Sequence, residues 1–110
     1  MRIWIPFKKK PPVVSVIRFS GTIAADGRFG SSAISDQSTK KIIEKAFAQK
    51  NISAVAIVIN SPGGSPVQSS LIAARVRRLA DERKIPVYAF IEDVAASGGY
   101  WLATAADHIY

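Results

Sequence analysis

The chain has 110 residues, enough for one small domain, and 48% of them are hydrophobic with no low-complexity tract, which indicates a globular fold rather than a disordered one. It contains no cysteine, which excludes disulfides, thiolate catalysis and thiolate metal sites. Fifteen Lys and Arg against eight Asp and Glu give a formal charge of +7, a bias toward anionic surfaces that does not define a function.

No apolar run is long enough to span a bilayer, and the first residues lack the apolar segment and cleavage site of a signal peptide. We therefore expect a cytoplasmic or membrane-associated location. Residues 1–12 form a basic N-terminal arm in which Arg2 and Lys8–Lys10 accompany Trp4 and Phe7. This mixture suits contact of residues 1–10 with a membrane surface, whereas a frayed basic terminus is the simpler interpretation, because so short a segment forms no stable amphipathic helix.

Strand and helix patterns alternate from residue 13 onward. The β-branched run 13–19 predicts a first strand, and the Gly- and Ser-rich stretch 20–37 predicts a long loop. Apolar residues at helical spacing predict a helix over 39–50, capped by Ser38 or Asp36. Asn51 is a suitable stop for this helix.

The second half of the chain continues the alternation. The unbroken apolar run 54–59 predicts a buried central strand. Ser65 as N-cap, Pro66 at the first helical position and Gln68 two residues later form a capping-box pattern, which predicts a helix from Pro66 to about Arg83.

A third strand is expected over 87–91, a short helix over 99–106 and the start of a further strand at 108–110. This order indicates an α/β fold of βαβ repeats with a mainly parallel sheet and right-handed crossovers. Because an element begins at the last residues, we expect residues 13–110 to be the N-terminal part of a larger domain.

Two glycine-bearing turns follow the second and third strands, at residues 60–65 and 93–99. Ligands of such sheets bind at the carboxyl ends of the strands, so both turns should face one crevice. The adjacent Gly63 and Gly64 leave backbone N–H groups unshielded just before a helix, which suits negative charge. The pattern matches neither the P-loop motif nor the glycine motif of dinucleotide-binding folds. We therefore expect the turn to stabilise the oxyanion of a carbonyl under attack rather than to bind a nucleotide.

Ser97 lies in the second turn, within V-A-A-S-G-G-Y-W. Small neighbours on both sides expose its hydroxyl, and the N–H of Gly98 can point to the same place. The alternative is that Ser97 only caps the following helix. The paired glycine turn one β-α unit earlier favours the catalytic interpretation.

At these residues the sequence closely resembles the signal peptide peptidase A family, including its SohB-type members, which are serine peptidases of the ClpP/crotonase fold. The matching stretches are I-N-S-P-G-G-S at 59–65, P-V-Q-S-S at 66–70 and E-D-V-A-A-S-G-G-Y-W-L-A-T-A-A at 92–106. The resemblance implies that Ser97 is the nucleophile, that the N–H groups of Gly64 and Gly98 form the oxyanion hole, and that a buried neutral lysine is the general base.

The sequence departs from the family at the base, because every lysine precedes Ser97 and none matches the family position. Lys40, Lys41 and Lys45 are better interpreted as a solvated helix face. His108 is the alternative base within the chain, although a histidine does not match the family. We expect the catalytic lysine to lie beyond residue 110.

Four further residues have structural interpretations. Glu92 and Asp93 are expected to be polar loop positions, because neighbours on an extended segment point apart. Tyr100 and Trp101 are expected in the core or an oligomer interface, since the aromatic pattern of an RNA-binding sheet is absent.

The resulting hypothesis is a serine endopeptidase acting through an acyl-enzyme on Ser97. Its expected partners are peptide substrates such as signal-peptide remnants, together with further copies of itself in a homo-oligomer. Neither nucleic acid, a metal nor an organic cofactor is indicated. Two alternatives stay open: a crotonase-like acyl-CoA enzyme using the same oxyanion hole, and a non-catalytic scaffold that binds peptides or partners at membranes.

Overall fold

Four parallel strands form one sheet in this computed structural model, which describes residues 11–25 and 33–110. The strands are β1 (Val13–Ser20), β2 (Ile52–Ser61), β3 (Val87–Ala95) and β4 (His108–Ile109), and they lie side by side in chain order. Each pair is parallel. The predicted α/β class with a parallel sheet is confirmed; the predictions about lipid contact of residues 1–10 fall outside the described residues.

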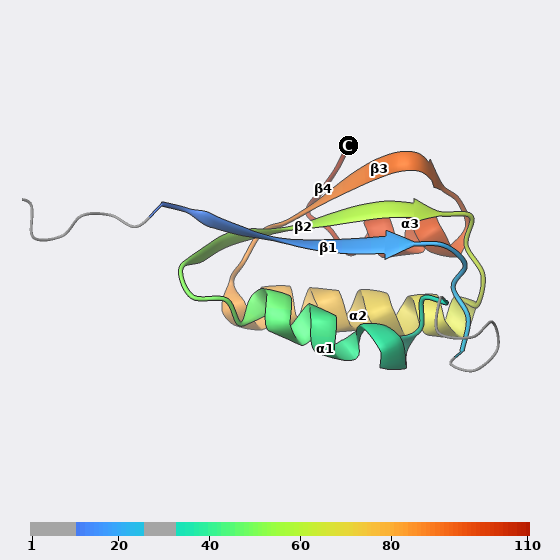
Figure 1. Ribbon diagram of the computed structural model, residues 1–110, viewed down its shortest axis with the longest axis horizontal. Coiled ribbons are helices and arrows are strands. Elements are labelled where there is room, and N and C mark those ends of the chain that lie inside the picture. The colour runs from blue at the N-terminus through green and yellow to red at the C-terminus, as the bar shows by residue number, and fades with distance from the viewer. Residues whose placement is uncertain (1–10, 26–32) are drawn as a thin grey trace, which may run out of the picture.

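Three helices connect the strands: α1 (Asp36–Phe47), α2 (Pro66–Arg83) and α3 (Gly98–Ala103). Right-handed crossovers between strands in sequential order place every helix on the same face. Figure 1 shows α1 and α2 side by side beneath the sheet, and α3 packs against α2 and the strands β2 and β3. No helix in residues 11–25 and 33–110 is long and apolar enough to cross a membrane.

The core lies between this helical layer and the sheet. In β1 the side chains alternate, so that Ile17 and Phe19 face the helices and are buried, while Val16 and Arg18 face the other side and are exposed. The remaining fully buried large side chains come from the helices, from the strands β2 and β3 and from the segment after β1: Ile23, Ile43, Phe47, Val55, Ile57, Ile59, Ile72, Val76, Val87 and Leu102.

The second face of the sheet is bare in the described part of the chain. Val16 is 60% exposed, Phe90 42% and Tyr110 65%. The rings of Phe90 and Tyr110 stack with centroids 5.4 Å apart, and Arg18 Nη1 lies 3.0 Å from Glu92 Oε1 across the strand between them. This face is unusual, because parallel sheets are normally covered on both sides.

Strand β3 is longer than predicted. Glu92 and Asp93, expected in a loop, lie within it, so that prediction is wrong. The pairing with β2 shifts register after Ile59 and resumes at Ser61 and Ala95. Glu92 and Asp93 lie in the irregular interval between these two paired stretches, and the pairing on both sides keeps their backbone extended, whatever their own preference for loops.

Helix α1 begins three residues before the predicted start and ends before Asn51. Its N-cap is Ser35 rather than Ser38 or Asp36. Ser35 Oγ accepts from the N–H of Ser38 at 2.9 Å, and Ser38 Oγ accepts from the N–H of Ser35 at 3.0 Å. The two serines thus cap the helix reciprocally, whereas the sequence pattern predicted a single cap. At the other end Ala48 is the C-cap.

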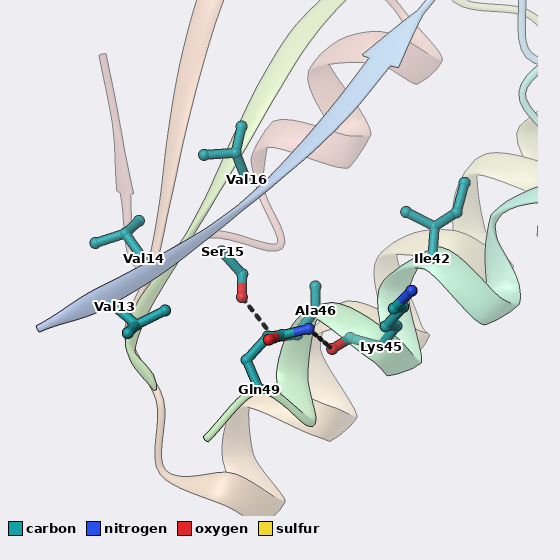
Figure 2. Close-up of a pocket in the computed structure, with 8 residues that line it drawn as sticks. All are labelled: Val13, Val14, Ser15, Val16, Ile42, Lys45, Ala46 and Gln49. Atoms are coloured by element: carbon teal, nitrogen blue, oxygen red, sulfur yellow. Dashed lines mark hydrogen bonds between the residues drawn. The ribbon is translucent and has the colours of Figure 1, made fainter. Parts of the chain in front are cut away.

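The carboxyl-terminal half of α1 is fastened to the start of β1. Ser15 Oγ donates to the carbonyl oxygen of Ala46 at 2.7 Å, as Figure 2 shows. Because Ser15 lies between two outward-facing valines, this bond holds the amino half of β1 at the edge of the helical layer.

The predicted bounds of helix α2 are confirmed. Of the two hydrogen bonds of the predicted capping box, the one to the Ser65 side chain is present and the one between the Gln68 side chain and the Ser65 backbone is not. Ser65 Oγ accepts from the N–H of Gln68 at 3.1 Å, and Pro66 is the first helical residue. The side chain of Gln68 does not turn back to Ser65. Its Oε1 instead accepts from the N–H of Asp36 at 2.7 Å and so joins the starts of α1 and α2.

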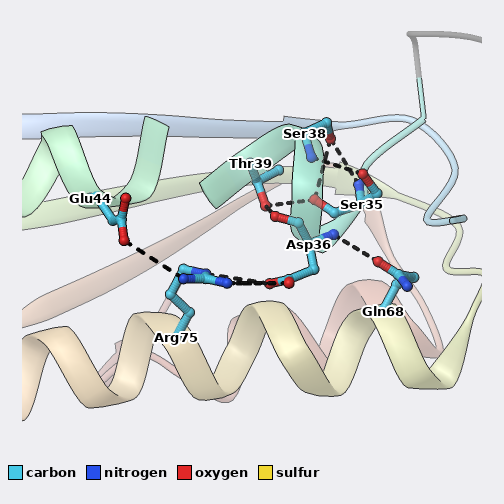
Figure 3. Close-up of polar contacts among 7 residues, drawn as sticks. All are labelled: Ser35, Asp36, Ser38, Thr39, Glu44, Gln68 and Arg75. Atoms are coloured by element: carbon cyan, nitrogen blue, oxygen red, sulfur yellow. Dashed lines mark hydrogen bonds and ion pairs between the residues drawn. The ribbon is translucent and has the colours of Figure 1, made fainter. Parts of the chain in front are cut away.

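Arg75 strengthens this junction, as Figure 3 shows. Its Nη2 lies 2.9 Å from Asp36 Oδ1 and 3.2 Å from Oδ2, and its Nη1 lies 3.8 Å from Glu44 Oε2. The side chains of Arg75 and Asp36 are only 16% and 26% exposed. We therefore expect this pair to contribute more than an ordinary surface ion pair.

Arg77 connects α2 to the residues that precede β4. It hydrogen-bonds to Asp81, to the carbonyl of Ala105 and to Asp107. The hydrogen bond with Asp81 raises the pKa of its guanidinium. Asp107 in turn accepts from the N–H of Val87, the first residue of β3, at 2.8 Å.

Replacing Arg75 tests the junction between α1 and α2. Arg75→Ala should lower the free energy of unfolding by about 2 kcal/mol, because Asp36 is left partly buried without its charged partner. The control is Arg78→Ala, which removes an exposed pair with Glu82 and should change stability by less than about 0.5 kcal/mol. Urea unfolding followed by circular dichroism measures both, and equal effects would contradict a special role for Arg75.

Candidate active site

The two glycine-bearing turns meet at the carboxyl ends of β2 and β3, as predicted. The N–H of Ala96 donates to the carbonyl of Ser61 at 3.1 Å. Gly63 lies so close to the second turn that a Cβ on it would be 2.9 Å from the Cβ of Ser97 and 3.0 Å from the nitrogen of Gly98. Only a residue without a side chain fits at position 63.

Ile23 holds the first turn from its other side. Its N–H donates to the carbonyl of Gly63 at 3.0 Å, and its carbonyl accepts from the N–H of Ser65 at 2.8 Å. Gly64 lies between these two bonds, so its own N–H points away from Ile23. A Cβ on Gly64 would collide with the carbonyl oxygen of Ile23, and its φ of 147° also favours glycine.

Ile23 lies in the stretch 20–37, which the sequence predicted to be a long loop, and its role at this turn was not predicted. Ile23 also bridges to Ile34, and both side chains are buried. Two apolar residues inside a Gly- and Ser-rich stretch were the available signal. Their pairing partners are distant in sequence, so no local pattern identified them.

Ser61 joins the two turns, and the sequence analysis assigned it no role. It is fully buried; its hydroxyl accepts from the N–H of Gly63 at 3.1 Å while its carbonyl holds Ala96. Gly99 packs directly on its backbone, since a Cβ at that position would lie 2.5 Å from the Ser61 carbonyl oxygen. The position of the second turn therefore depends on Ser61.

Ser97 is exposed and occupies the N-cap position of α3, yet its side chain makes no capping hydrogen bond. Its backbone has φ 54° and ψ −118°, a conformation that costs a residue with a Cβ about 1–3 kcal/mol. The capping interpretation of Ser97 is therefore wrong. The turn holds a strained serine whose hydroxyl is directed to no partner in the helix.

Two backbone donors near Ser97 are unused. Within residues 11–25 and 33–110, the N–H groups of Gly64 and Gly98 donate to no protein acceptor. Gly98 is buried, and a Cβ on it would collide with the hydroxyl oxygen of Ser69. The arrangement therefore combines one free hydroxyl with two free amides, which is what stabilisation of a carbonyl oxyanion requires.

The two turns that meet at Ser97, residues 60–65 and 93–99, contain neither a histidine nor a lysine that could act as the general base. His108 pairs with Tyr88 near the amino end of β3, the opposite end of the strand from Ser97, which excludes it as the base in this arrangement. Lys40, Lys41 and Lys45 are exposed on α1, as expected, and Lys84 caps the far end of α2. No three His, Asp or Glu side chains in the described part gather into a metal site.

The two aromatic residues after Ser97 do not enter the core. Tyr100 is 53% exposed and Trp101 43% exposed, so the prediction of core packing is wrong. The six-residue helix α3 instead directs Leu102 and Ala103 inward. A role for Tyr100 and Trp101 in an oligomer interface stays a prediction.

Comparison with known proteins agrees with this geometry. Residues 79–110 match the family model of peptidase family S49. The chain is 38% identical over 100 residues to the chloroplastic serine protease SPPA of Arabidopsis thaliana, covering 87% of this chain and 14% of that protein. A solved structure of a mutant of the 1510-N membrane-bound stomatin-specific protease superposes with a TM-score of 0.65 and 25% identity, over 92% of this chain and 44% of that one.

Another relative bears a different name. The chain is 50% identical over 103 residues to a protein named Na(+)/H(+) antiporter NhaA from Brucella melitensis biotype 1. The match covers 94% of this chain but 14% of the antiporter's length. The shared segment is thus a small part of that protein. The name antiporter describes that whole protein and is not transferred to this chain.

The parallel sheet with its two paired glycine turns defines an α/β protein of the ClpP-like fold, and the expected fold class is confirmed. The resemblance to the signal peptide peptidase A type is confirmed as well, since residues 79–110 match peptidase family S49 and the chain is similar to a chloroplastic serine protease SPPA. The chain spans about one seventh of the length of the two relatives described here, 14% in each case.

Because the backbone of Ser97 is strained, replacing this residue should stabilise the fold, whereas most substitutions destabilise it. Ser97→Gly should raise the free energy of unfolding by about 1 kcal/mol, because relief of the positive φ outweighs the added entropy of the unfolded glycine. Thermal or urea unfolding measures the change. Ser70→Gly, within α2, is the control and should lower stability by about 0.5 kcal/mol. A loss of stability in both variants would contradict strain at position 97.

Proposed function

We propose that this chain carries the nucleophile and the oxyanion hole of a serine endopeptidase of the signal peptide peptidase type. The observation that supports this most directly is the exposed Ser97 hydroxyl, unused as a helix cap, together with the free amides of Gly98 in the same turn and Gly64 in the adjoining turn. The match of residues 79–110 to peptidase family S49 and the name of the Arabidopsis relative, a serine protease, support the same function.

In the proposed reaction the Oγ of Ser97 attacks the carbonyl carbon of a peptide bond. The electron pair of the C=O bond moves to oxygen, and the N–H groups of Gly64 and Gly98 stabilise the oxyanion. Collapse of the tetrahedral intermediate breaks the C–N bond and leaves an acyl-enzyme, and the amine departs with a proton from the general base. Water then hydrolyses the ester.

The proposed base is a lysine that takes the proton of Ser97 and delivers it to the leaving amine. Since the lysines of the described part are all exposed, we propose that it comes from outside these 110 residues. Burial would keep such a lysine neutral at physiological pH and allow it to accept a proton.

The proposed substrates are peptides such as signal-peptide remnants or fragments of membrane proteins, cleaved by a homo-oligomer. The solved relative is named a membrane-bound protease, which agrees with substrates at membranes. The exposed lysines give one alternative some weight: without a base supplied from elsewhere, the same crevice would bind peptides without cleaving them.

A cysteine at position 97 tests the oxyanion hole without the lysine, since a thiol ionises near pH 8.5 by itself. The chain has no cysteine, so Ser97→Cys introduces a single thiol. Its rate of acylation by a peptide p-nitrophenyl ester is divided by its rate of alkylation by iodoacetamide. Alkylation forms no oxyanion, so this ratio separates oxyanion stabilisation from the amount of thiolate.

The control is Ser53→Cys, at an exposed position near the start of β2. We expect the ratio to be about 100-fold higher for Ser97→Cys, the usual contribution of oxyanion-hole donors. Equal ratios would contradict the oxyanion hole and favour the scaffold. Replacing the ester by acetyl-CoA distinguishes the acyl-CoA alternative, which predicts faster acylation by the CoA thioester than by the peptide ester.

A further inference from the structure

A groove of about 370 Å³ lies between the amino half of β1 and the carboxyl half of α1, far from Ser97. Figure 2 shows the residues that line it: Ile42 and Ala46 lie on the helix, whereas Val14 and Val16 on the strand point away from the helix. The strand meets the active-site turns at its other end, where Gly21 donates to the carbonyl of Asn60. The groove is therefore separate from the turn that carries Ser97.

The groove runs along a free edge of the sheet. In the described residues β1 pairs with β2 alone, so its other edge carries N–H and C=O groups without a strand partner. Proteins usually protect such edges with proline, charge or a bulge. Here Pro11 and Pro12 precede the strand and a register shift follows Val13, but residues 14–17 contain neither proline nor charge.

The polar groups at the floor of the groove are already bonded. Ser15 Oγ donates to the carbonyl of Ala46 at 2.7 Å, and Gln49 Nε2 donates to the carbonyl of Lys45 at 3.4 Å. A ligand in the groove would therefore meet apolar side chains on one side and the strand edge on the other. This combination suits an extended peptide, which offers both side chains and backbone hydrogen bonds.

The rim of the groove is positive. Lys45 lines it and makes no ion pair with any described residue, and Lys41 is exposed one turn earlier on the same helix. The acid next to Lys45 in sequence, Glu44, faces Arg75 instead. A second copy of the chain would bring further positive charge to a molecule of formal charge +7, which disfavours self-pairing here.

We propose that this groove binds an extended acidic segment of a partner protein, which adds to the free edge of β1 as a new strand. Its alternate side chains pack on Ile42 and Ala46, and an Asp or Glu on the same side pairs with Lys45. The main-chain hydrogen bonds to β1 give affinity, and the pairing with Lys45 selects acidic sequences. The site does not depend on the chemistry at Ser97.

A synthetic strand tests the charge requirement. The probe is acetyl-Thr-Val-Thr-Glu-Thr-Val-amide labelled with fluorescein, and its binding is measured by fluorescence anisotropy at low salt. We expect saturable binding that Lys45→Glu weakens about tenfold and that a probe with Lys in place of Glu does not show. The matched control Lys40→Glu makes the same charge change on α1 outside the groove and should weaken binding no more than about twofold.

Two further probes test strand addition itself. In an added strand the N–H groups of every second residue face β1. Two probes are therefore compared, one N-methylated at the odd-numbered residues and one at the even-numbered residues, and only one of them should lose binding. Amide NMR shifts on binding should centre on residues 14–17 and on Ala46. The proposal is overturned if neither or both methylated probes lose binding, or if the shifts centre on Ser97. It is also overturned if the simple apolar anion decanoate binds the groove and the peptide does not, or if the free chain dimerises through β1.

Discussion

The candidate active site depends on a close approach between two stretches of backbone that have no side chains in the way. Gly63 lies against Ser97 and Gly98, and Ser61 holds both turns through its hydroxyl and its carbonyl. This contact requires β2 and β3 to be parallel neighbours, so that both strands end at the same edge. The order of the sheet, the starts of α2 and α3 and the exposure of the serine all follow from that requirement.

Elements with local signals were predicted well from the sequence. The start of α2 follows from Ser65 and Pro66, which act on adjacent backbone, and the predicted start at Pro66 was confirmed. Features that depend on distant partners were not predicted. Ile23 pairs with a turn about forty residues later, and the side chain of Gln68 bonds to the N–H of Asp36 rather than to its own N-cap residue. Tertiary pairing decided these features, and no local pattern contains it.

For the site, the sequence indicated which residues lie together but not how they are held. The positions of Ser97, Gly64 and Gly98 in one crevice could be inferred from glycine spacing and from strand order. The left-handed backbone of Ser97 and the double role of the buried Ser61 could not, because a serine between small residues is equally typical of a helix cap. The roles assigned to the three residues stay predictions.

The bare face of the sheet has a consequence for how the chain behaves in solution. Val16, Phe90 and Tyr110 form exposed apolar surface on a molecule whose formal charge of +7 adds an electrostatic repulsion between its copies. Salt weakens that repulsion, with a screening length of about 10 Å at 0.1 M, while it leaves the attraction between apolar surfaces intact. Colloidal stability of the chain should therefore fall as ionic strength rises, opposite to the behaviour of proteins that associate through charge.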